Sequence, residues 1–599
     1  MKRTFSKVVL TAVSAAVLLA ACSKVPDESK HIPKTAGVVL DLNAKQISQK
    51  LVTNGVTMDK LFSAVQNKDT ANQMTKAWKD AENSGVDLKG HFFASVVFQG
   101  VATENKSYLS LTASLTDAAK FEDYLKKNVP DFSLKTQNDF KYIWQEKQQA
   151  VIGWTKSTVI YISLFNANDL QKFAPPGTPG LPAPTDNNEY QEEAAVADSA
   201  VAVPAALVAA EETAPKAWVD EIDHLFHLKK EETAGSIEAF AKLLKENADM
   251  GVFVNPEAIY NSAQFTMIPA NFKKLMQDSY YTGTVNFEKG KIVMDGSSFM
   301  GKELAAIYKK SDKKVIDMDM LKKYPSDNIT GFLSYAFDFH VIGEIIKSTG
   351  MDGLANAFLS GKSGLTLDDI LNAFEGQLTY IASDFAITKK ESEYFPGEFT
   401  EKPEAKWIFN LKVGNKDAFN KVMTSPLLKD MFAREGDRYV ISNPMVAAGF
   451  PPISITEKFI TVGSDSVLLQ QYLAGKGSIK LPEGIESKVK GSMIGGYVDL
   501  EKITKTIPED KLADDEKPLM QSVKNLFKDI SLVGHPLEGN VQHTEAVLTF
   551  KNKDENSLVQ LINFGTAAAK VIQDKKAKEK AYEDSLLSAP VDTAATAAY

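Results

Sequence analysis

The stretch Gly331-Phe332-Leu333-Ser334-Tyr335-Ala336-Phe337-Asp338 decides the fold, because an apolar, strand-like run ends there at an aspartate that precedes a helix-like segment. Residues 36–42, 251–256 and 495–500 repeat this plan. In all four, an Asp or Asn stands where the helix would begin, namely Asp41 or Asn43, Asn255, Asp338 and Asp499. A short side-chain acceptor there satisfies amides that the first helical turn leaves free. We therefore interpret these residues as helix caps and not as a constellation of charges.

A longer repeat relates the two halves of the chain. The strand-like segment near Gly90 and the helix-like segment near Phe121 correspond to those near Gly376 and Phe419. The two offsets are 286 and 298 residues, and the extra residues fall in the loop 391–404. Because the order of segments is the same in both halves, we predict the duplication of a mixed unit of roughly 140 residues.

A smaller unit with a hairpin signal follows each large one. Strand-like runs flank Gly290 in the first, and the runs 537–541 and 546–550 take similar roles in the second. Short hairpins and a strand meander favour antiparallel pairing. The predicted fold class is α+β, with duplicated large–small units, mostly antiparallel sheets and helices packed on one face. The predicted boundaries are 1–21 for a lipoprotein signal peptide, 22–31 for a tether, 32–174 for large unit 1, 175–217 for an insertion, 218–320 for small unit 1, 321–484 for large unit 2, 485–574 for small unit 2, and 575–599 for a charged helix and frayed tail.

The composition is that of a globular protein and excludes several classes. Of the 599 residues, 44% are hydrophobic and 24% are charged, unlike a collagen, a coiled-coil rod or a wholly disordered chain. The net charge is −9 at pH 7, and it becomes −12 once Lys2, Arg3 and Lys7 are removed with a signal peptide. Such an acidic chain has no general attraction to nucleic acid. The single cysteine excludes an intrachain disulfide and a cysteine-cluster metal site.

The N-terminus has the features of a bacterial lipoprotein signal. Positive residues precede an apolar run of 14 residues (8–21), which is too short to span a bilayer. The run ends in Leu19-Ala20-Ala21-Cys22, which resembles a lipobox. By this resemblance Cys22 receives a diacylglyceryl group and, after cleavage, acyl chains such as palmitate at its amino group. An ordinary secretory signal is the alternative. We expect a lipid-anchored protein of the cell envelope, at the outer membrane because Ser23 is not an inner-membrane retention residue.

Residues 175–217 interrupt the pattern of the large units. Alanine, proline and acidic residues dominate this stretch, and Lys216 is its only basic residue. Such a composition cannot form a packed core, so we predict a disordered insertion, with a transient helix at 195–210.

A search for compact catalytic motifs gives few candidates. Gly361-Lys362-Ser363 lacks the earlier glycine of a P-loop, and we predict no nucleotide site. His224 and His227 share one helix face with Asp220, Asp223 and Glu231, so they are weak candidates for a metal site. A solvated face of an amphipathic helix explains them better. Trp144, Trp154 and Trp407 could line a sugar platform, but core packing is commoner for aromatic residues in strands. We expect no cofactor and assign no catalytic residue.

The lipobox, the start at 32–39, Gly85-Val86-Asp87-Leu88 and Phe121-Glu122-Asp123-Tyr124-Leu125 resemble a family of large Bacteroidetes lipoproteins, the domain of unknown function 4836. The resemblance covers most of the mature chain and implies location and architecture, because the matching residues are structural.

Two classes of function remain open. A non-catalytic envelope lipoprotein that binds or scaffolds a protein or polymer partner is favoured, because duplicated sheets build large surfaces without a reactive residue. The alternative is an envelope hydrolase or metal-dependent enzyme whose site is assembled from scattered residues.

Overall fold

A computed structural model describes residues 25–57, 75–76, 78–101, 104–165, 205–261, 268–311, 314–391, 399–509, 512, 514 and 516–587. Cys22, the predicted site of lipid attachment, and most of the predicted insertion lie outside these ranges. By their internal contacts the residues form two compact units. Unit 1 comprises Met1–Ser48, Trp78–Val285 and Ser297–Leu304, and unit 2 comprises Gln49–Ala77, Asn286–Gly296 and Ala305–Tyr599.

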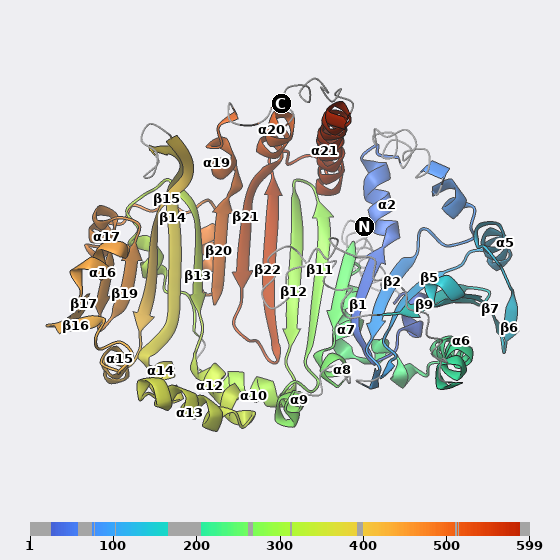
Figure 1. Cartoon of the computed structure of the whole chain (residues 1–599), viewed down its shortest axis with the longest axis horizontal. Helices are drawn as coiled ribbons and strands as arrows, with labels where there is room; N and C mark the ends of the chain where they lie inside the picture. Colours follow the sequence, from blue (N-terminus) through green and yellow to red (C-terminus); the bar gives the residue numbers. More distant parts are fainter. Residues whose placement is uncertain are drawn as a thin grey trace, which may run out of the picture. The chain divides into compact units, whose positions relative to one another are not determined.

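Helices and strands alternate along the described chain, which confirms the α+β class (Figure 1). The elements up to residue 311 are η1 (Asp27–His31), β1 (Ala36–Asn43), α2 (Ala44–Thr53), β2 (His91–Val97), β3 (Gly100–Val101), β4 (Glu104–Asn105), β5 (Tyr108–Ser114), α5 (Ala118–Asn128), β6 (Lys135–Gln137), β7 (Phe140–Gln145), η2 (Glu146–Gln148), β8 (Ala150–Trp154), β9 (Thr158–Leu164), α6 (Ala205–Phe226), η4 (Lys230–Glu232), η5 (Ala234–Ser236), α7 (Glu238–Lys245), β10 (Met250–Val254), α8 (Pro256–Tyr260), α9 (Ala270–Leu275), β11 (Tyr280–Glu288), β12 (Lys291–Phe299) and α10 (Lys302–Lys310). The later elements are α11 (Met318–Lys322), β13 (Ile329–Ala336), α12 (His340–Ser348), α13 (Asp352–Ser363), α14 (Leu367–Ala373), β14 (Phe374–Glu391), β15 (Phe399–Val413), α15 (Lys416–Met423), β16 (Phe432–Glu435), β17 (Arg438–Ile441), α16 (Pro444–Gly449), β18 (Ile453–Thr456), β19 (Phe459–Gly463), α17 (Ser466–Leu473), α18 (Ile485–Val489), β20 (Ile494–Asp499), α19 (Leu500–Lys505), α20 (Lys517–Leu526), β21 (Phe527–Gly534), β22 (Val541–Phe550) and α21 (Ser557–Leu587).

The two units repeat one order of antiparallel strand pairings. In unit 1 the order is β11, β10, β1, β2, β5, β9, β8, β7, β6. In unit 2 it is β21, β20, β13, β14, β15, β19, β18, β17, β16, and β22 pairs with β21. Each strand in the unit 1 order therefore has a counterpart in unit 2, with β1 matching β13, β2 matching β14 and β5 matching β15, whereas β3 and β4 pair only with each other.

The predicted helix caps are present in both units. Asn43 accepts a hydrogen bond from the Gln46 amide at 3.2 Å, and Asn255 accepts one from the Ala258 amide at 3.2 Å. At the equivalent positions of unit 2, Asp338 bonds the His340 amide at 3.0 Å and Asp499 the Lys502 amide at 2.9 Å. These contacts confirm the cap prediction at Asn255 and Asp499 and assign the first cap to Asn43, since Asp41 bonds the His91 ring instead, at 2.8 Å. The prediction is wrong for Asp338, because the N-cap of α12 is Phe339 and Asp338 precedes it. The repeated sequence signal is therefore structural.

One face of each sheet carries packed helices. In unit 1, α6 and α7 contribute Ile222, Leu225 and Phe240 to a core with the strands. In unit 2, α11, α17 and α18 pack on strand residues such as Phe332 and Ile408. Burial of each such side chain contributes about 1.5–3 kcal/mol. These helices hold the central strands from one side.

Two sequence predictions are wrong in detail. Residues 205–217, which were predicted to belong to the disordered insertion, are helical, because alanine favours helix and α6 continues into the amphipathic turns that pack on the core. The run 537–541 is not a strand of its own: Gly539 and Asn540 form a turn in which Gly539 has φ +62°, Val541 begins β22, and the first strand of that hairpin is β21. In neither case does composition alone locate the end of the element.

Among the described helices, none has the length and apolar character needed to span a membrane.

Candidate functional site

The predicted metal candidates lie on the exposed side of α6. His224 is exposed, and Ile222 and Leu225 on the opposite side are fully buried. His227 Nδ1 lies 2.8 Å from the carbonyl oxygen of Asp223, which raises the pKa of His227, and its Nε2 lies 3.4 Å from Asp139 Oδ1. The described residues contain no cluster of three or more His, Cys, Asp or Glu side chains suited to a metal ion. The geometry favours the solvated-face interpretation.

Each unit has a carboxylate–imidazole pair at 2.8 Å, Asp41 with His91 in unit 1 and Asp338 with His340 in unit 2. His340 Nδ1 lies 2.8 Å from Asp338 Oδ1, and His340 Nε2 lies 3.0 Å from Asn372 Oδ1. The bonds to Asn372 and then Asp338 raise the pKa of His340. Burial tends to raise the pKa of Asp338, but the bonds from Ser311 and His340 outweigh it and lower that pKa. Because both ring nitrogens are occupied, this pair is held as a structural ion pair and not as a free base.

An uncovered apolar surface occupies the central strands of unit 2, on the side opposite α11, α17 and α18. We call it the open face of unit 2. Strand register places its members in three rows across β20, β13, β14 and β15. They are Ile494, Gly496, Val498, Gly331, Leu333, Tyr335, Leu378, Tyr380, Ala382, Trp407, Phe409 and Leu411. Leu333 is 45% exposed and Tyr380 is 41% exposed, and none of the set is charged.

Unit 1 has the same surface at the same register positions, on β10, β1, β2 and β5. This open face of unit 1 consists of Met250, Val252, Val254, Val38, Leu40, Leu42, Phe92, Ala94, Val96, Leu109, Leu111 and Ala113. Every member is apolar. Leu40 is 51% exposed and Leu111 is 45% exposed. Contiguous apolar surface of this kind usually marks a binding site in a soluble protein.

The polar residues of the same strands point the other way, under the helices. This set is fully buried and comprises Asp41, Asn43, Ser95, Ser110, Thr112, Ser334, Gln377, Thr379, Ser383 and Asn410. Several of their hydrogen-bonding groups find partners there: the Ser334 and Thr379 hydroxyls lie 3.0 Å apart, and Thr461 donates to Asn410 at 2.8 Å, whereas the buried Ser110 hydroxyl has no partner among the described residues. The usual pattern, with polar residues outside, is thus reversed on these strands.

A helix borders each open face at its far edge. In unit 2, Ile460 pairs with Leu411 of the open face, and α15 packs over Ile460 and Ile455 with Phe419 and Val422. In unit 1, α5 packs in the same way over strands β7, β8 and β9, with Phe121 and Leu125 against Ile152 and Val159. The open faces are therefore bounded surfaces beside a helix.

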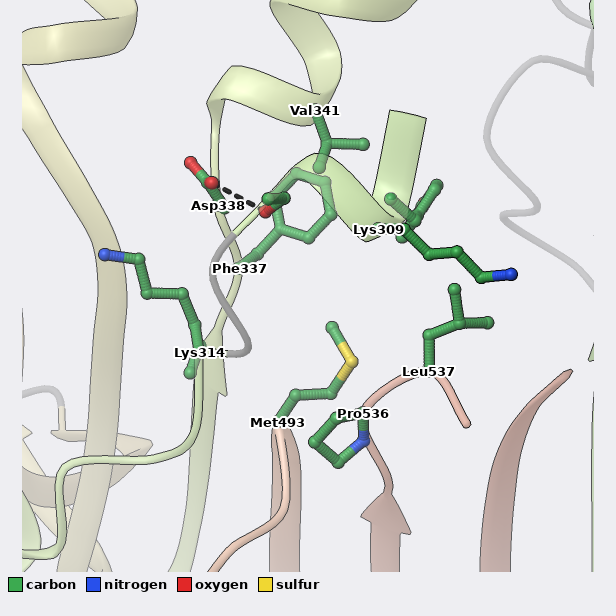
Figure 2. A pocket seen from close by; sticks show the side chains of 11 residues that line it. Lys309, Lys314, Phe337, Asp338, Val341, Met493, Pro536 and Leu537 are labelled. Carbon is green, nitrogen blue, oxygen red and sulfur yellow. Dashed lines mark hydrogen bonds between the residues drawn. The ribbon is translucent and has the colours of Figure 1, made fainter. Parts of the chain in front are cut away.

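A small cavity lies at one end of the unit 2 open face. Its volume is about 130 Å³, and Figure 2 shows Phe337, Val341, Met493, Pro536 and Leu537 around it. Tyr335 of the open face stacks on Phe337, with ring centroids 5.9 Å apart, so apolar surface continues into the cavity.

The charged groups around this cavity have partners within unit 2. Lys309 donates to Asn540 at 2.6 Å, Ser311 donates to Asp338 at 2.6 Å, and Lys314 lies 3.7 Å from Glu375. The arrangement can hold a small apolar group but offers no aligned nucleophile and base.

The three tryptophans considered for a sugar platform occupy different environments. Trp154 is 2% exposed and packs on Phe121, so it belongs to the core. Trp144 packs against the core under α6. Trp407 belongs to the open face and stacks on Tyr380, with ring centroids 6.0 Å apart. The structure therefore does not bring the three together.

Comparisons with known proteins add little to this geometry. No protein-family model and no curated protein matches the chain. Among solved structures, crystal form IV of TP0453 is similar at 7% sequence identity with a TM-score of 0.22, over 46% of this chain and 81% of that chain. Crystal form I of TP0453 gives 7% identity and a TM-score of 0.20, over 46% and 80% of the two chains. Similarity at this level supports no statement about function.

Proposed function

We propose that this chain is a lipid-anchored protein of the cell envelope, at the outer membrane, that binds a partner on its open faces without catalysing a reaction. The observation that carries the proposal is the recurrence of the open face, at equivalent register positions, in both units. An exposed sheet face without charged residues occurs in both units, and such apolar surfaces are usually covered by a binding partner. The lipobox at Cys22 supports the location.

Binding is favoured over catalysis by the state of the titratable groups. Asp338 and His340 are hydrogen-bonded to each other, and they also bond Ser311 and Asn372, respectively. The His227 ring faces carboxylate and carbonyl oxygens on the exposed side of α6. A general base needs a free nitrogen or oxygen and a pKa near the working pH. These contacts favour binding over the alternative of a hydrolase or metal-dependent enzyme at the two histidine sites described above.

Site-specific photo-crosslinking in intact cells tests the proposal. A photoreactive amino acid replaces Leu40 in unit 1 or Leu333 in unit 2, and Leu427 serves as the matched control, because it is a 62% exposed leucine that belongs to neither open face. We expect adducts from positions 40 and 333 that position 427 does not give. Identical adducts at all three positions, or none at 40 and 333, would overturn the proposal.

A further inference from the structure

The chemistry of the open faces restricts what can cover them. The unit 1 set is wholly apolar, and in the unit 2 set the only polar groups are the hydroxyls of Tyr335 and Tyr380 and the indole N–H of Trp407. The backbone groups of these central strands are paired with neighbouring strands on both sides. A typical protein–protein interface needs about ten direct hydrogen bonds and has a polar rim. The open faces themselves supply almost none of these groups, so burial of apolar surface would have to provide most of the binding free energy.

The charge of the chain and the shape of the surfaces restrict the occupant further. The mature chain carries −12, so an anionic bilayer surface would repel it. The helices α5 and α15 rise at the edge of the open faces and would obstruct close contact with a flat bilayer. Long, flexible, uncharged chains have neither difficulty, and they gain favourable burial with every methylene placed on the surface.

We propose that the open faces bind the acyl chains of membrane lipids, taken up as individual molecules. This inference rests on the proposed binding function and names the ligand class. Rows such as Leu42, Leu40 and Val38 run along a strand and continue across the neighbouring strands at each level, so an extended hydrocarbon chain meets apolar side chains over its length. In unit 2 the stack of Tyr335 on Phe337 extends this surface to the 130 Å³ cavity, which suits the end of a chain.

Two measurements on the mature chain from Ser23 onward test the inference, because this chain lacks both the apolar run 8–21 and the lipid expected at Cys22. The first is extraction of the purified protein and mass spectrometry of co-purified lipids. The second is titration with dansyl-labelled undecanoic acid. We expect co-purified diacyl lipids and saturable binding of the fluorescent acid.

Charge substitutions on the open faces locate the binding. A buried carboxylate opposes a hydrocarbon ligand strongly, so Leu40→Glu combined with Leu333→Glu should weaken binding of the fluorescent acid by about tenfold or more. Leu427→Glu, at an exposed leucine outside the open faces, should leave the affinity within about twofold. Circular dichroism and a melting curve confirm that each variant is folded. The co-purification result holds even if the double variant fails to fold.

Each contrary outcome has a distinct meaning. Absence of co-purified lipid together with absence of saturable acid binding overturns the inference. Equal weakening by Leu427→Glu also overturns it, because the acid would then bind elsewhere. Flotation with phosphatidylethanolamine–phosphatidylglycerol vesicles without binding of the free acid would replace it with bilayer docking. In the photo-crosslinking experiment, positions 40 and 333 could instead form adducts with another protein or with another segment of this chain. That result, together with no binding of the fluorescent acid, would refute the lipid ligand but not the proposed binding function.

Discussion

Leu40 and Leu333 occupy the same place in two repeated sheets. Leu40 pairs with Val252 on one side and Ala94 on the other, and Leu333 pairs with Gly496 and Tyr380 on the equivalent strands. Both leucines are about half exposed, at 51% and 45%. The repeated fold therefore places an exposed leucine at the centre of an apolar surface in both units, as the proposed binding function requires.

Replacing Leu333 should barely change the stability of the isolated protein. Leu333→Thr keeps a residue suited to strands, and we expect the free energy of unfolding to change by less than about 0.5 kcal/mol. Its neighbour Phe332 is 3% exposed under the helices, and Phe332→Ala should cost about 3–5 kcal/mol. Denaturant unfolding followed by circular dichroism measures both. If Leu333→Thr lowered the free energy of unfolding by about 2 kcal/mol or more, the open face would be packed in the free protein.

The buried polar network under α17 should be costly to break. Tyr472 donates to the Met320 carbonyl at 2.7 Å and accepts from Asn410 at 3.0 Å. Tyr472→Phe leaves both groups buried and unsatisfied, so we expect a loss of about 1–3 kcal/mol in unfolding free energy. Tyr335→Phe on the open face is the matched control and should be nearly neutral. Equal effects of the two substitutions would contradict the assignment of covered and open faces.

The stability of the protein should depend on His340 as the pH rises. The pKa of His340 is raised in the folded state, so its contribution is fully present below the unfolded value of 6.5 and is lost as the pH rises through the folded pKa. His340→Gln should remove that fall in unfolding free energy. Burial lowers the pKa of His31, so its effect has the opposite sign: stability is lost as the pH falls below 6.5. A pH series of melts on the unsubstituted chain and on His340→Gln tests the sign for His340. A steeper fall of the unfolding free energy with rising pH in His340→Gln would refute the assignment.

Anchoring should depend on one thiol. Because Cys22 ends the lipobox and is the single cysteine, Cys22→Ser should abolish metabolic labelling with palmitate and release the protein from the membrane pellet or leave it unprocessed. Labelling and pelleting like those of the unsubstituted chain would disprove the lipoprotein interpretation. Ser23→Ala provides a control that retains the thiol.

Sequence patterns predict the class of fold and most of the caps but not the open faces. Alternation such as Leu333-Ser334-Tyr335 predicts a strand, and the ordinary expectation places its apolar side in the core. The helices pack on the other side, over Ser334, because side chains from α11, α17 and α18 combine there with Phe332 and Ile408 in one core. Which face a distant helix covers depends on long-range packing, and a single sequence contains no local signal for it. In both halves, apolar residues alternate with buried polar residues along four matched strands. This repeated alternation is the sequence signal that could have indicated the open faces.

The helix boundaries show the same limitation at short range. The alanine-rich start of α6 at Ala205 resembles the insertion in composition, and only its continuation into residues that pack on the core stabilises it as a helix. The predicted residue limits of the four large and small units stay predictions, since the contacts divide the chain into two compact units.

Protection of a single thiol on the open face in the native envelope tests the central claim most directly. With Cys22 expected to be lipidated, Leu333→Cys provides a unique reactive thiol, and Leu427→Cys provides an exposed control. The account predicts that a maleimide reagent labels position 333 much more slowly in intact envelopes than in the purified, delipidated protein, and labels position 427 at the same rate in both. Equal labelling of position 333 in the two preparations would contradict the claim that the open face is covered in use.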